Sequence, residues 1–400
     1  MKKVELLSPV GNWEMLVAAI EAGADSVYLG IKGSNMRERA NNFSTKDLKK
    51  VTDYAHKNKR KVYLTLNTII FDKELKKIEK ILKAAKKAKI DAVICWDLAV
   101  ISICKKLGLE IHLSTQGSCS NSESIKIYEK LGIKRFVLAR ECSLEQIKKL
   151  SKTKDIEVFM HGAMCVSVSG RCFLSQFLYG CSANRGKCIQ PCRRSYLIKD
   201  PETKKELKIC NNYIMSPKDL CTLPFIERLI KTNVRCLKIE GRARSPEYVK
   251  VVTGVYREAI DAYYSKKLNI NLKKRLMDKL KTVYNRGFSS GFYLGKPINE
   301  WTTGYGTKAT KRKIYLGKIT NFYKKISVAE VRIDTGKVKI GDSLLVIGPV
   351  TGVHEQKVEE MQFEKGKDTK IAKKGQLVAI KTNKICKKSD KVYLLKLVKN

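Results

Sequence analysis

Acidic residues are scarce in this chain of 400 residues. It has 39 Asp and Glu residues against 81 Lys and Arg residues, which gives a formal net charge of +42. A positive field of this size favours polyanionic partners, and nucleic acid is the natural candidate. A chain that uses lysine as a general surface residue would show the same balance. Net charge informs on binding partners and not on fold.

Long apolar runs are also missing. No uninterrupted stretch approaches the ~20 residues of a membrane span. Near the N-terminus, Glu5, Gly11 and Glu14 interrupt any apolar core of a signal peptide. We therefore expect a cytoplasmic protein without membrane contact. In that reducing compartment the thirteen cysteines, an odd number, favour thiols or metal ligands over a disulfide framework.

Several signatures of hydrolases and metal sites are absent. There is no G-x-S-x-G and no H-E-x-x-H motif. The cysteines follow neither the paired C-x2-C of a zinc ribbon nor the C-x2-C-x2-C run of a ferredoxin. His161 and Cys165 are close enough in sequence for a cysteine-protease pair, but no third, orienting group is marked.

What the chain does have is a cysteine-rich stretch from Glu157 to Arg194. Thiolates are the ligands that iron–sulfur clusters need, and interleaved glycines let the backbone bend around a cluster. Nearby arginines would offset the negative charge of thiolates and sulfide. The spacing leaves an iron–sulfur cluster, zinc, and isolated structural or redox thiols all open. The five cysteines are Cys165, Cys172, Cys181, Cys188 and Cys192.

Upstream and downstream of this stretch, short β-rich runs alternate with amphipathic helical patterns. Asn12, Ser44 and Ser143 stand where helix N-caps belong. The alternation predicts an α/β protein with a (β/α)8 TIM-like barrel, and an open doubly wound sheet is the alternative. The eight predicted strands are Val4–Ser8, Ser26–Gly30, Lys61–Asn67, Asp91–Asp97, Glu110–Thr115, Arg135–Arg140, Ile156–Gly162 and Arg235–Gly241.

The C-terminal ends of these strands are unusually polar. Active sites of this barrel fold lie at that end, so we expect the polar side chains to line one mouth and to suit an anionic ligand. Asn67, Thr115 and Gln116 belong to this set. The candidate catalytic residues are Asp97, Arg140, Glu141, His161, Glu240 and Arg242.

The pattern also predicts the domain organisation. Residues 1–299 form the barrel, and a Cys-rich insertion at 163–234 follows the seventh strand. A turn-rich, basic linker spans residues 300–313. Alternating apolar residues with Gly turns over 314–400 predict a small all-β barrel, which either contacts RNA backbone or only stabilises the chain.

Seven segments of the chain resemble the peptidase U32 family. LLSPVGNWEMLVAAIEAGADSVYLG, LARE and EVFMHGAMCVSVSGRC stand in the N-terminal half; SANRGKCIQPCR, SPKDLC, LKIEGRARS and NRGFSSGF follow. Together they span nearly the full barrel. The resemblance implies an iron–sulfur protein, most similar to the family's tRNA hydroxylation branch. That branch makes wobble 5-hydroxyuridine without oxygen, with prephenate as the implied cosubstrate.

Carried over to this chain, the resemblance implies a 4Fe-4S cluster on Cys165, Cys172, Cys188 and Cys192. Cys181 would be a bystander, and Cys221 a possible substitute ligand. Arg140 and Arg242 would then hold the anionic cosubstrate, with His161 as a proton-transfer candidate. The alternatives are ribosomal RNA hydroxylation, the collagenase-like peptidase activity of the family's label, and a non-catalytic RNA-binding protein with structural zinc.

Overall fold

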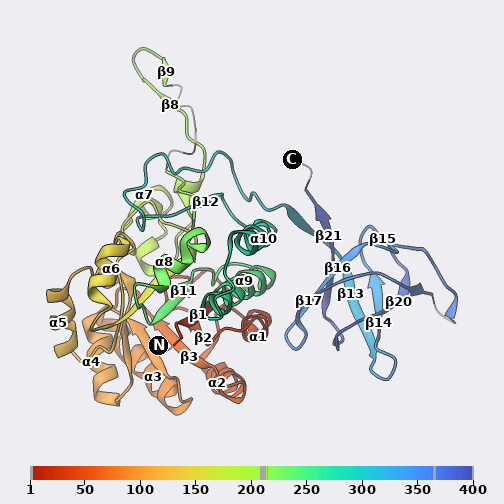
Figure 1. The fold of residues 1–400 in the computed structure, drawn as a ribbon, viewed down its shortest axis with the longest axis horizontal. Coiled ribbons are helices and arrows are strands. Elements are labelled where there is room, and N and C mark those ends of the chain that lie inside the picture. Colours follow the sequence, from red (N-terminus) through yellow and green to blue (C-terminus); the bar gives the residue numbers. More distant parts are fainter. Residues whose placement is uncertain (1–2, 208–212, 214, 364–365, 399–400) are drawn as a thin grey trace.

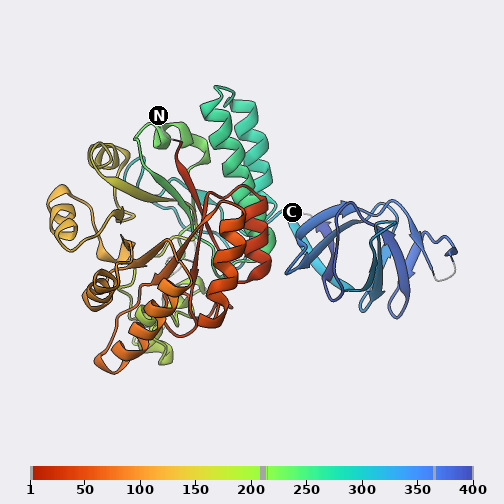
Figure 2. The same ribbon diagram turned by 90° about the horizontal axis from the view of Figure 1, so that it is seen from below.

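The computed structural model describes residues 3–207, 213, 215–363 and 366–398. Eight parallel strands form a closed barrel, because β11 pairs with both β1 and β7. Helices surround this ring (Figures 1 and 2). The predicted TIM-like barrel is therefore confirmed, and the open sheet is excluded. The strands are β1 (Glu5–Pro9), β2 (Ser26–Gly30), β3 (Lys61–Leu66), β4 (Ala92–Cys95), β5 (Ile111–Leu113), β6 (Arg135–Val137), β7 (Asp155–Gly162) and β11 (Cys236–Ile239).

The helices between the strands begin where the sequence places their caps. Asn12 Oδ1 accepts a hydrogen bond from Met15 N at 2.9 Å, and Ser143 Oγ caps Gln146 N. At Ser44 the hydrogen bonds run in the opposite direction, because the Asp47 carboxylate accepts from the Ser44 amide and hydroxyl. The helices are α1 (Trp13–Glu21), α2 (Leu48–Lys57), α3 (Leu75–Lys87), α4 (Leu98–Leu107), α5 (Ser122–Lys130), α6 (Leu144–Leu150), α8 (Ile226–Ile230), α9 (Pro246–Tyr264) and α10 (Ile270–Lys281).

The long connection between β7 and β11 carries structure of its own. It contains α7 (Leu174–Tyr179) and a two-stranded hairpin of β8 (Ile198–Lys199) and β9 (Glu206–Leu207), which projects from the barrel in Figure 1. It returns as β10 (Asp219–Cys221), which pairs antiparallel with the end of β7, and β10 also pairs with β12 (Phe288–Ser289). These pairings attach the insertion to the mouth of the barrel.

The C-terminal part is a separate antiparallel sheet with its own apolar core. Its first strand begins at Lys311, within the range expected for the linker. The chain order of the strands is β13 (Lys311–Tyr323), β14 (Val328–Ile333), β15 (Lys337–Lys339), β16 (Ser343–Gly348), β17 (Gly352–Lys357), β18 (Met361–Gln362), β19 (Ile371–Lys373), β20 (Leu377–Lys381) and β21 (Lys391–Leu397). Seven of them form the main sheet, while β15 and β19 pair separately.

This sheet packs against the helices of the barrel and not against its mouth. Ala18 of α1 shares a buried cluster with Leu345, Ile347 and Val353 of the sheet. Lys250 Nζ of α9 donates to the Val353 carbonyl at 2.6 Å. The two units are therefore joined by a specific contact. Within the described residues, no helix is both long and apolar enough to cross a membrane.

Candidate functional site

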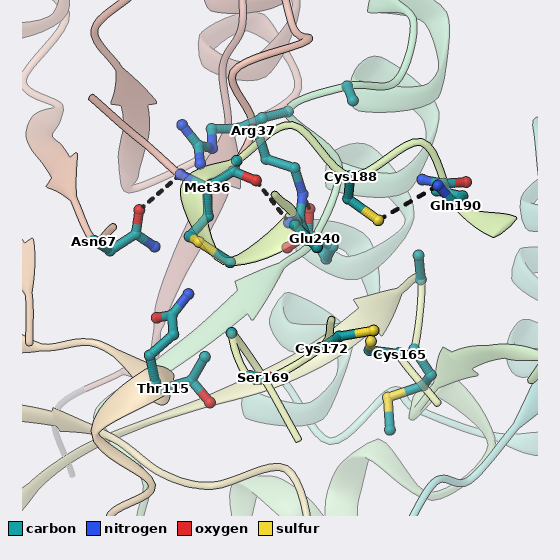
Figure 3. A pocket seen from close by; sticks show the side chains of 18 of the residues that line it. Met36, Arg37, Asn67, Thr115, Cys165, Ser169, Cys172, Cys188, Gln190 and Glu240 are labelled. Carbon is teal, nitrogen blue, oxygen red and sulfur yellow. Dashed lines mark hydrogen bonds and ion pairs between the residues drawn. The ribbon is translucent and has the colours of Figure 1, made fainter. Parts of the chain in front are cut away.

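A cavity of about 480 Å³ opens at the C-terminal ends of the barrel strands. Its wall combines side chains that follow the strands with side chains of the insertion (Figure 3). Asn67, Thr115 and Gln116 belong to it, as the strand-end pattern predicted. The cavity is therefore at the position where barrels of this kind carry their active sites.

Positive charge dominates the cavity wall. Glu240 is the one carboxylate among the described residues that line it. Cationic side chains confined around so little negative charge attract anions. The cationic lining residues are Arg37, Arg39, Arg140, Arg193, Lys238, Arg242, Arg244 and Arg286.

Glu240 is the centre of an arginine cluster. Its Oε1 lies 3.1 Å from Arg37 Nε, and its Oε2 lies 3.7 Å from an Arg140 guanidinium nitrogen. Burial by itself would raise the pKa of Glu240, but Arg37, Arg140 and Arg242 outweigh it and lower the pKa to about 2. Burial lowers the pKa of Arg242 to about 10, and its Nη1 donates to Asn35 at 2.9 Å. Glu240 is thus a permanent counter-ion and a poor proton donor.

Arg140 keeps an unused donor. Its Nη1 donates to the Ala163 carbonyl at 2.8 Å, and its guanidinium lies 4.0 Å from the Phe159 ring centroid. Its Nε is buried and has no partner among the described residues. An unpaired buried donor of this kind is costly.

The four cysteines predicted as cluster ligands all line this cavity. Cys165 is exposed, and the other three are half-buried; three of the set are labelled in Figure 3. Burial raises the pKa of Cys188 and of Cys192, and the charges of the neighbouring thiolates raise it further, while Arg37 and Arg193 act in the opposite direction. Burial thus disfavours the thiolate form of Cys188 and Cys192.

The remaining candidate cysteines lie outside the cavity wall. Cys181 is not among the lining residues. Cys221 is 2% exposed, and its Sγ lies 3.6 Å from the hydroxyl of Tyr256. Cys210 lies outside the described residues. The structure thus brings together only four of the cysteines at the mouth, considering the part of the chain that it describes.

A zinc ion needs each sulfur about 2.3 Å from the metal. In the described part of the chain, no group of three or more His, Cys, Asp or Glu side chains is placed to hold a metal ion.

His161 is not a lining residue of the cavity. Its Nδ1 lies 3.2 Å from the Tyr256 hydroxyl, and the rings of Tyr248 and Phe288 pack nearby. Burial, with a smaller contribution from Arg244, lowers the pKa of His161 to about 3. At neutral pH its imidazole is neutral, weakly basic and separated from the cavity.

A β-bulge explains why His161 faces away from the barrel interior. Lys238 pairs with Phe159, and both line the cavity, but the next partner of β11, Ile239, pairs with His161. One extra residue, Met160, therefore lies between the two pairs on β7. Such an insertion reverses the side to which the following residues point. His161 consequently points with Ile239 towards the helices.

Asp97 and Glu141 also lie outside the cavity wall. Asp97 caps α4, because its carboxylate accepts from Ala99 N at 2.9 Å and also from Ile70 N at 3.1 Å. Glu141 is exposed in the turn before α6. Both positions are explained by the local structure of the βα connections.

Several lining cations were not predicted from the sequence, among them Arg37 and Lys238. Arg37 lies in the loop after β2, far in sequence from Glu240 and from the cysteines. Lys238 is buried on β11, where its Nζ donates to Glu157 Oε1 at 2.7 Å. A lysine two residues before Glu240 in an apolar strand was the available signal for Lys238. No comparable pattern marked Arg37.

Arg185 attaches the insertion to the barrel. Its two terminal nitrogens contact the Glu74 carboxylate at 2.7 and 2.6 Å. These hydrogen bonds lower the pKa of Glu74 to about 2. Because folding lowers this pKa, the stabilisation is complete above the unfolded value of about 4.5 and is lost as the pH falls towards 2.

We expect Glu74→Gln to loosen the insertion at neutral pH. The substitution removes the charged partner of Arg185, so trypsin should cleave within residues 163–199 faster than in the wild type, as measured by mass spectrometry of the fragments. The wild type should lose the same protection only between about pH 5 and pH 2, with pepsin as the protease. Glu79→Gln, which removes an exposed partner of Lys83, is the control. Equal cleavage of both variants would contradict this role.

Comparison with known proteins agrees with the resemblance seen in the sequence. The model of the family described as Peptidase family U32 matches residues 11–303. The chain belongs to peptidase family U32. This U32 chain is 45% identical to a collagenase of Porphyromonas gingivalis, over 97% of each chain. It is 33% identical to tRNA hydroxylation protein P1 of Bacillus subtilis, over 96% of this chain and 93% of that protein. It is also 37% identical to a 23S rRNA 5-hydroxycytidine synthase of Escherichia coli, over 65% of this chain and 40% of that protein.

Proposed function

We propose that this U32 chain is an RNA hydroxylation protein that converts a tRNA wobble uridine to 5-hydroxyuridine. The observation that carries the proposal is the cavity in which cations surround Glu240 and four cysteines reach the same wall. The names of the Bacillus subtilis and Escherichia coli relatives support RNA hydroxylation as the reaction. The net charge of +42 supports a polyanionic substrate.

The arginine cluster suits a small anionic cosubstrate, for which prephenate is our proposal. Arg140 and Arg242 both line the cavity, and Arg242 is held in place by Asn35. Arginine is well suited to carboxylates because its planar guanidinium donates two parallel hydrogen bonds. These side chains would bind and orient the carboxylates, and Glu240 would keep the arginines in place.

The cysteine set fits an iron–sulfur cluster in its chemistry. Four thiols on one cavity wall provide the ligands, and Arg37 and Arg193 lie close enough to lower the cost of forming thiolates. We propose Cys165, Cys172, Cys188 and Cys192 as the ligands of a 4Fe-4S cluster. With four cysteine ligands, such a cluster supplies electron transfer or local structure.

Peptidase activity is the second candidate, because the relative from Porphyromonas gingivalis is named a collagenase. A cysteine peptidase needs a basic imidazole beside its thiol. His161 is enclosed by aromatic rings with a pKa of about 3, and no histidine is found among the described lining residues. The geometry of the site therefore argues against a peptidase that uses a Cys–His pair.

Nucleoside analysis of tRNA tests the proposal. The wild-type chain, expressed in a strain that lacks wobble hydroxylation, should restore 5-hydroxyuridine in mass spectra of digested tRNA. Arg140→Met should reduce the product by roughly 10²-fold, the usual cost of one lost charge-stabilising donor. Arg228→Met, at an exposed position on α8, is the matched control.

Two outcomes would redirect this assignment. Product in 23S rRNA as 5-hydroxycytidine, with unmodified tRNA, would make ribosomal RNA the substrate. Peptidase activity would be the better hypothesis if pure protein cleaves gelatin, Cys165→Ala abolishes the cleavage, and neither RNA is modified.

A further inference from the structure

The outer face of α7 leaves large aromatic side chains in solvent. Phe177 is 83% exposed and Phe173 is 60% exposed, and their ring centroids lie 6.0 Å apart. Tyr179 is 43% exposed, with the Arg194 guanidinium 5.3 Å from its ring centroid. Clustered apolar exposure of this kind marks an interaction surface. We call Phe173, Phe177 and Tyr179 the α7 aromatic face.

The α7 aromatic face borders the cavity directly. Cys172, which precedes Phe173, and two residues of the helix, Leu174 and Ser175, line the cavity. Ser175 Oγ accepts a hydrogen bond from Ile189 N at 3.2 Å, which joins the helix to the loop that carries Cys188. One side of α7 is thus cavity wall, and the aromatic rings lie on the solvent side of the same short helix.

The charge around α7 selects the kind of partner. Residues 163–199 contain no Asp or Glu. Of the cations in this segment, Arg185 is neutralised by Glu74, while Arg171, Lys187 and Arg194 are exposed. A second copy of this segment would bring like charges together. A polyanion with planar apolar groups complements both the exposed cations and the exposed aromatic rings.

We propose that the α7 aromatic face stacks unpaired bases of the RNA strand that flank the nucleotide held in the cavity. The inference rests on the proposed RNA hydroxylation and specifies the form of the substrate, a single-stranded loop. Aromatic side chains stack readily on bases that are splayed out of a helix. In a duplex the bases already stack on one another, and the target atom cannot enter an enclosed site.

The exposed cations support the same arrangement. Arg194 lies over Tyr179, so one end of the aromatic face combines a ring with a guanidinium. This combination can contact a base and its phosphate together. The strand would then continue into the arginine-lined cavity, where Glu240 is the one carboxylate among the described lining residues.

Binding measurements on two RNA forms test the inference. Fluorescence anisotropy would follow the full-length protein with a labelled single strand of about twelve nucleotides and with a duplex of equal length. Phe173→Ala/Phe177→Ala should weaken single-strand binding about ten-fold or more, while duplex binding changes less than about two-fold. Ile270→Ala, at a residue 82% exposed on α10, is the matched control and should leave both affinities unchanged. Thermal melting checks that the exposed substitutions preserve folding.

Each contrary result has a distinct meaning. Single-strand binding that survives the double substitution would overturn the stacking role, and so would equal weakening for both RNA forms. A wild-type dimer that dissociates in the double variant, seen by analytical ultracentrifugation, would assign the face to a second copy and overturn the inference. The RNA product is measured separately. Selective loss of single-strand binding without any hydroxylated nucleoside would refute the reaction and keep the stacking surface, whereas a hydroxylated product with unselective binding would refute the stacking surface alone.

Discussion

Cys192→Ala should deprive the anaerobically purified protein of its iron and sulfide. Four cysteine ligands hold the proposed cluster, so removal of one half-buried thiol opens an iron to solvent and to loss. Iron should fall from about four per chain to background, together with the visible absorption of the protein. Formation of 5-hydroxyuridine should fall to background as well, because the cluster and the shape of the cavity are lost together.

Cys181→Ala is the matched control for this experiment. Cys181 lies in the same segment and is half-buried like Cys192, but it is not part of the cavity wall. The control should keep its iron, colour and activity. A Cys181 variant that loses iron, or a Cys192 variant that keeps it, would show that the ligand set is different. A colourless wild type with one zinc ion would replace the cluster with a structural zinc site.

Glu240→Ala should cause the largest loss of stability among substitutions at the cavity. It removes the carboxylate that faces Arg37, Arg140 and Arg242 and leaves these guanidinium groups close together without a counter-ion. Breaking a buried ion pair in this way costs about 3–5 kcal/mol. Thermal and urea unfolding should both show this loss. Glu123→Ala should change stability by less than about 0.5 kcal/mol, since its partner Lys126 is exposed.

Added polyvalent anion provides a second measurement on the Glu240→Ala protein. An anion that binds the vacated arginine cluster stabilises the folded state by mass action. Citrate should therefore raise the melting temperature of this variant more than that of the Glu123→Ala control. No shift in either protein would mean that the arginines do not form an anion site, and equal positive shifts would mean that removal of Glu240 does not improve it. An unchanged melting temperature of Glu240→Ala without citrate would contradict the counter-ion role.

The barrel was predictable because the local sequence signals for its strands and helices agree with the way these elements pack. Apolar runs such as Ser26–Gly30 fill buried strands, and Leu98–Leu107 is bounded by Asp97 as N-cap and by Gly108 in a left-handed conformation. Strands that carry little apolar pattern were missed. β10 has only three residues, and β17 contains the polar sequence HEQK. Such strands form because a neighbouring strand offers hydrogen-bonding groups, and that neighbour is not evident from the segment itself.

The candidate site likewise contains residues that could be predicted from the sequence and residues that could not. Arg140, Glu240 and Arg242 were identified because each lies at the end of a predicted strand, and the fold brings strand ends together. His161 also follows this rule in sequence, but the bulge at Met160 turns it towards the helices. Arg37 could not be found because its proximity to Glu240 depends on the path of a loop. Sequence periodicity locates strand ends, whereas bulges and loops determine which of them face the cavity.

The contact between the C-terminal sheet and α1 limits how freely the two units could have been exchanged in evolution. Gly352 has a φ of +66°, and a Cβ atom there would lie 2.7 Å from Val17 Cγ1 of α1. Ala18 is fully buried beside Leu345 and Val353. A barrel recombined with an unrelated appendage would expose this part of α1, so the helix surface and the sheet are expected to be inherited together.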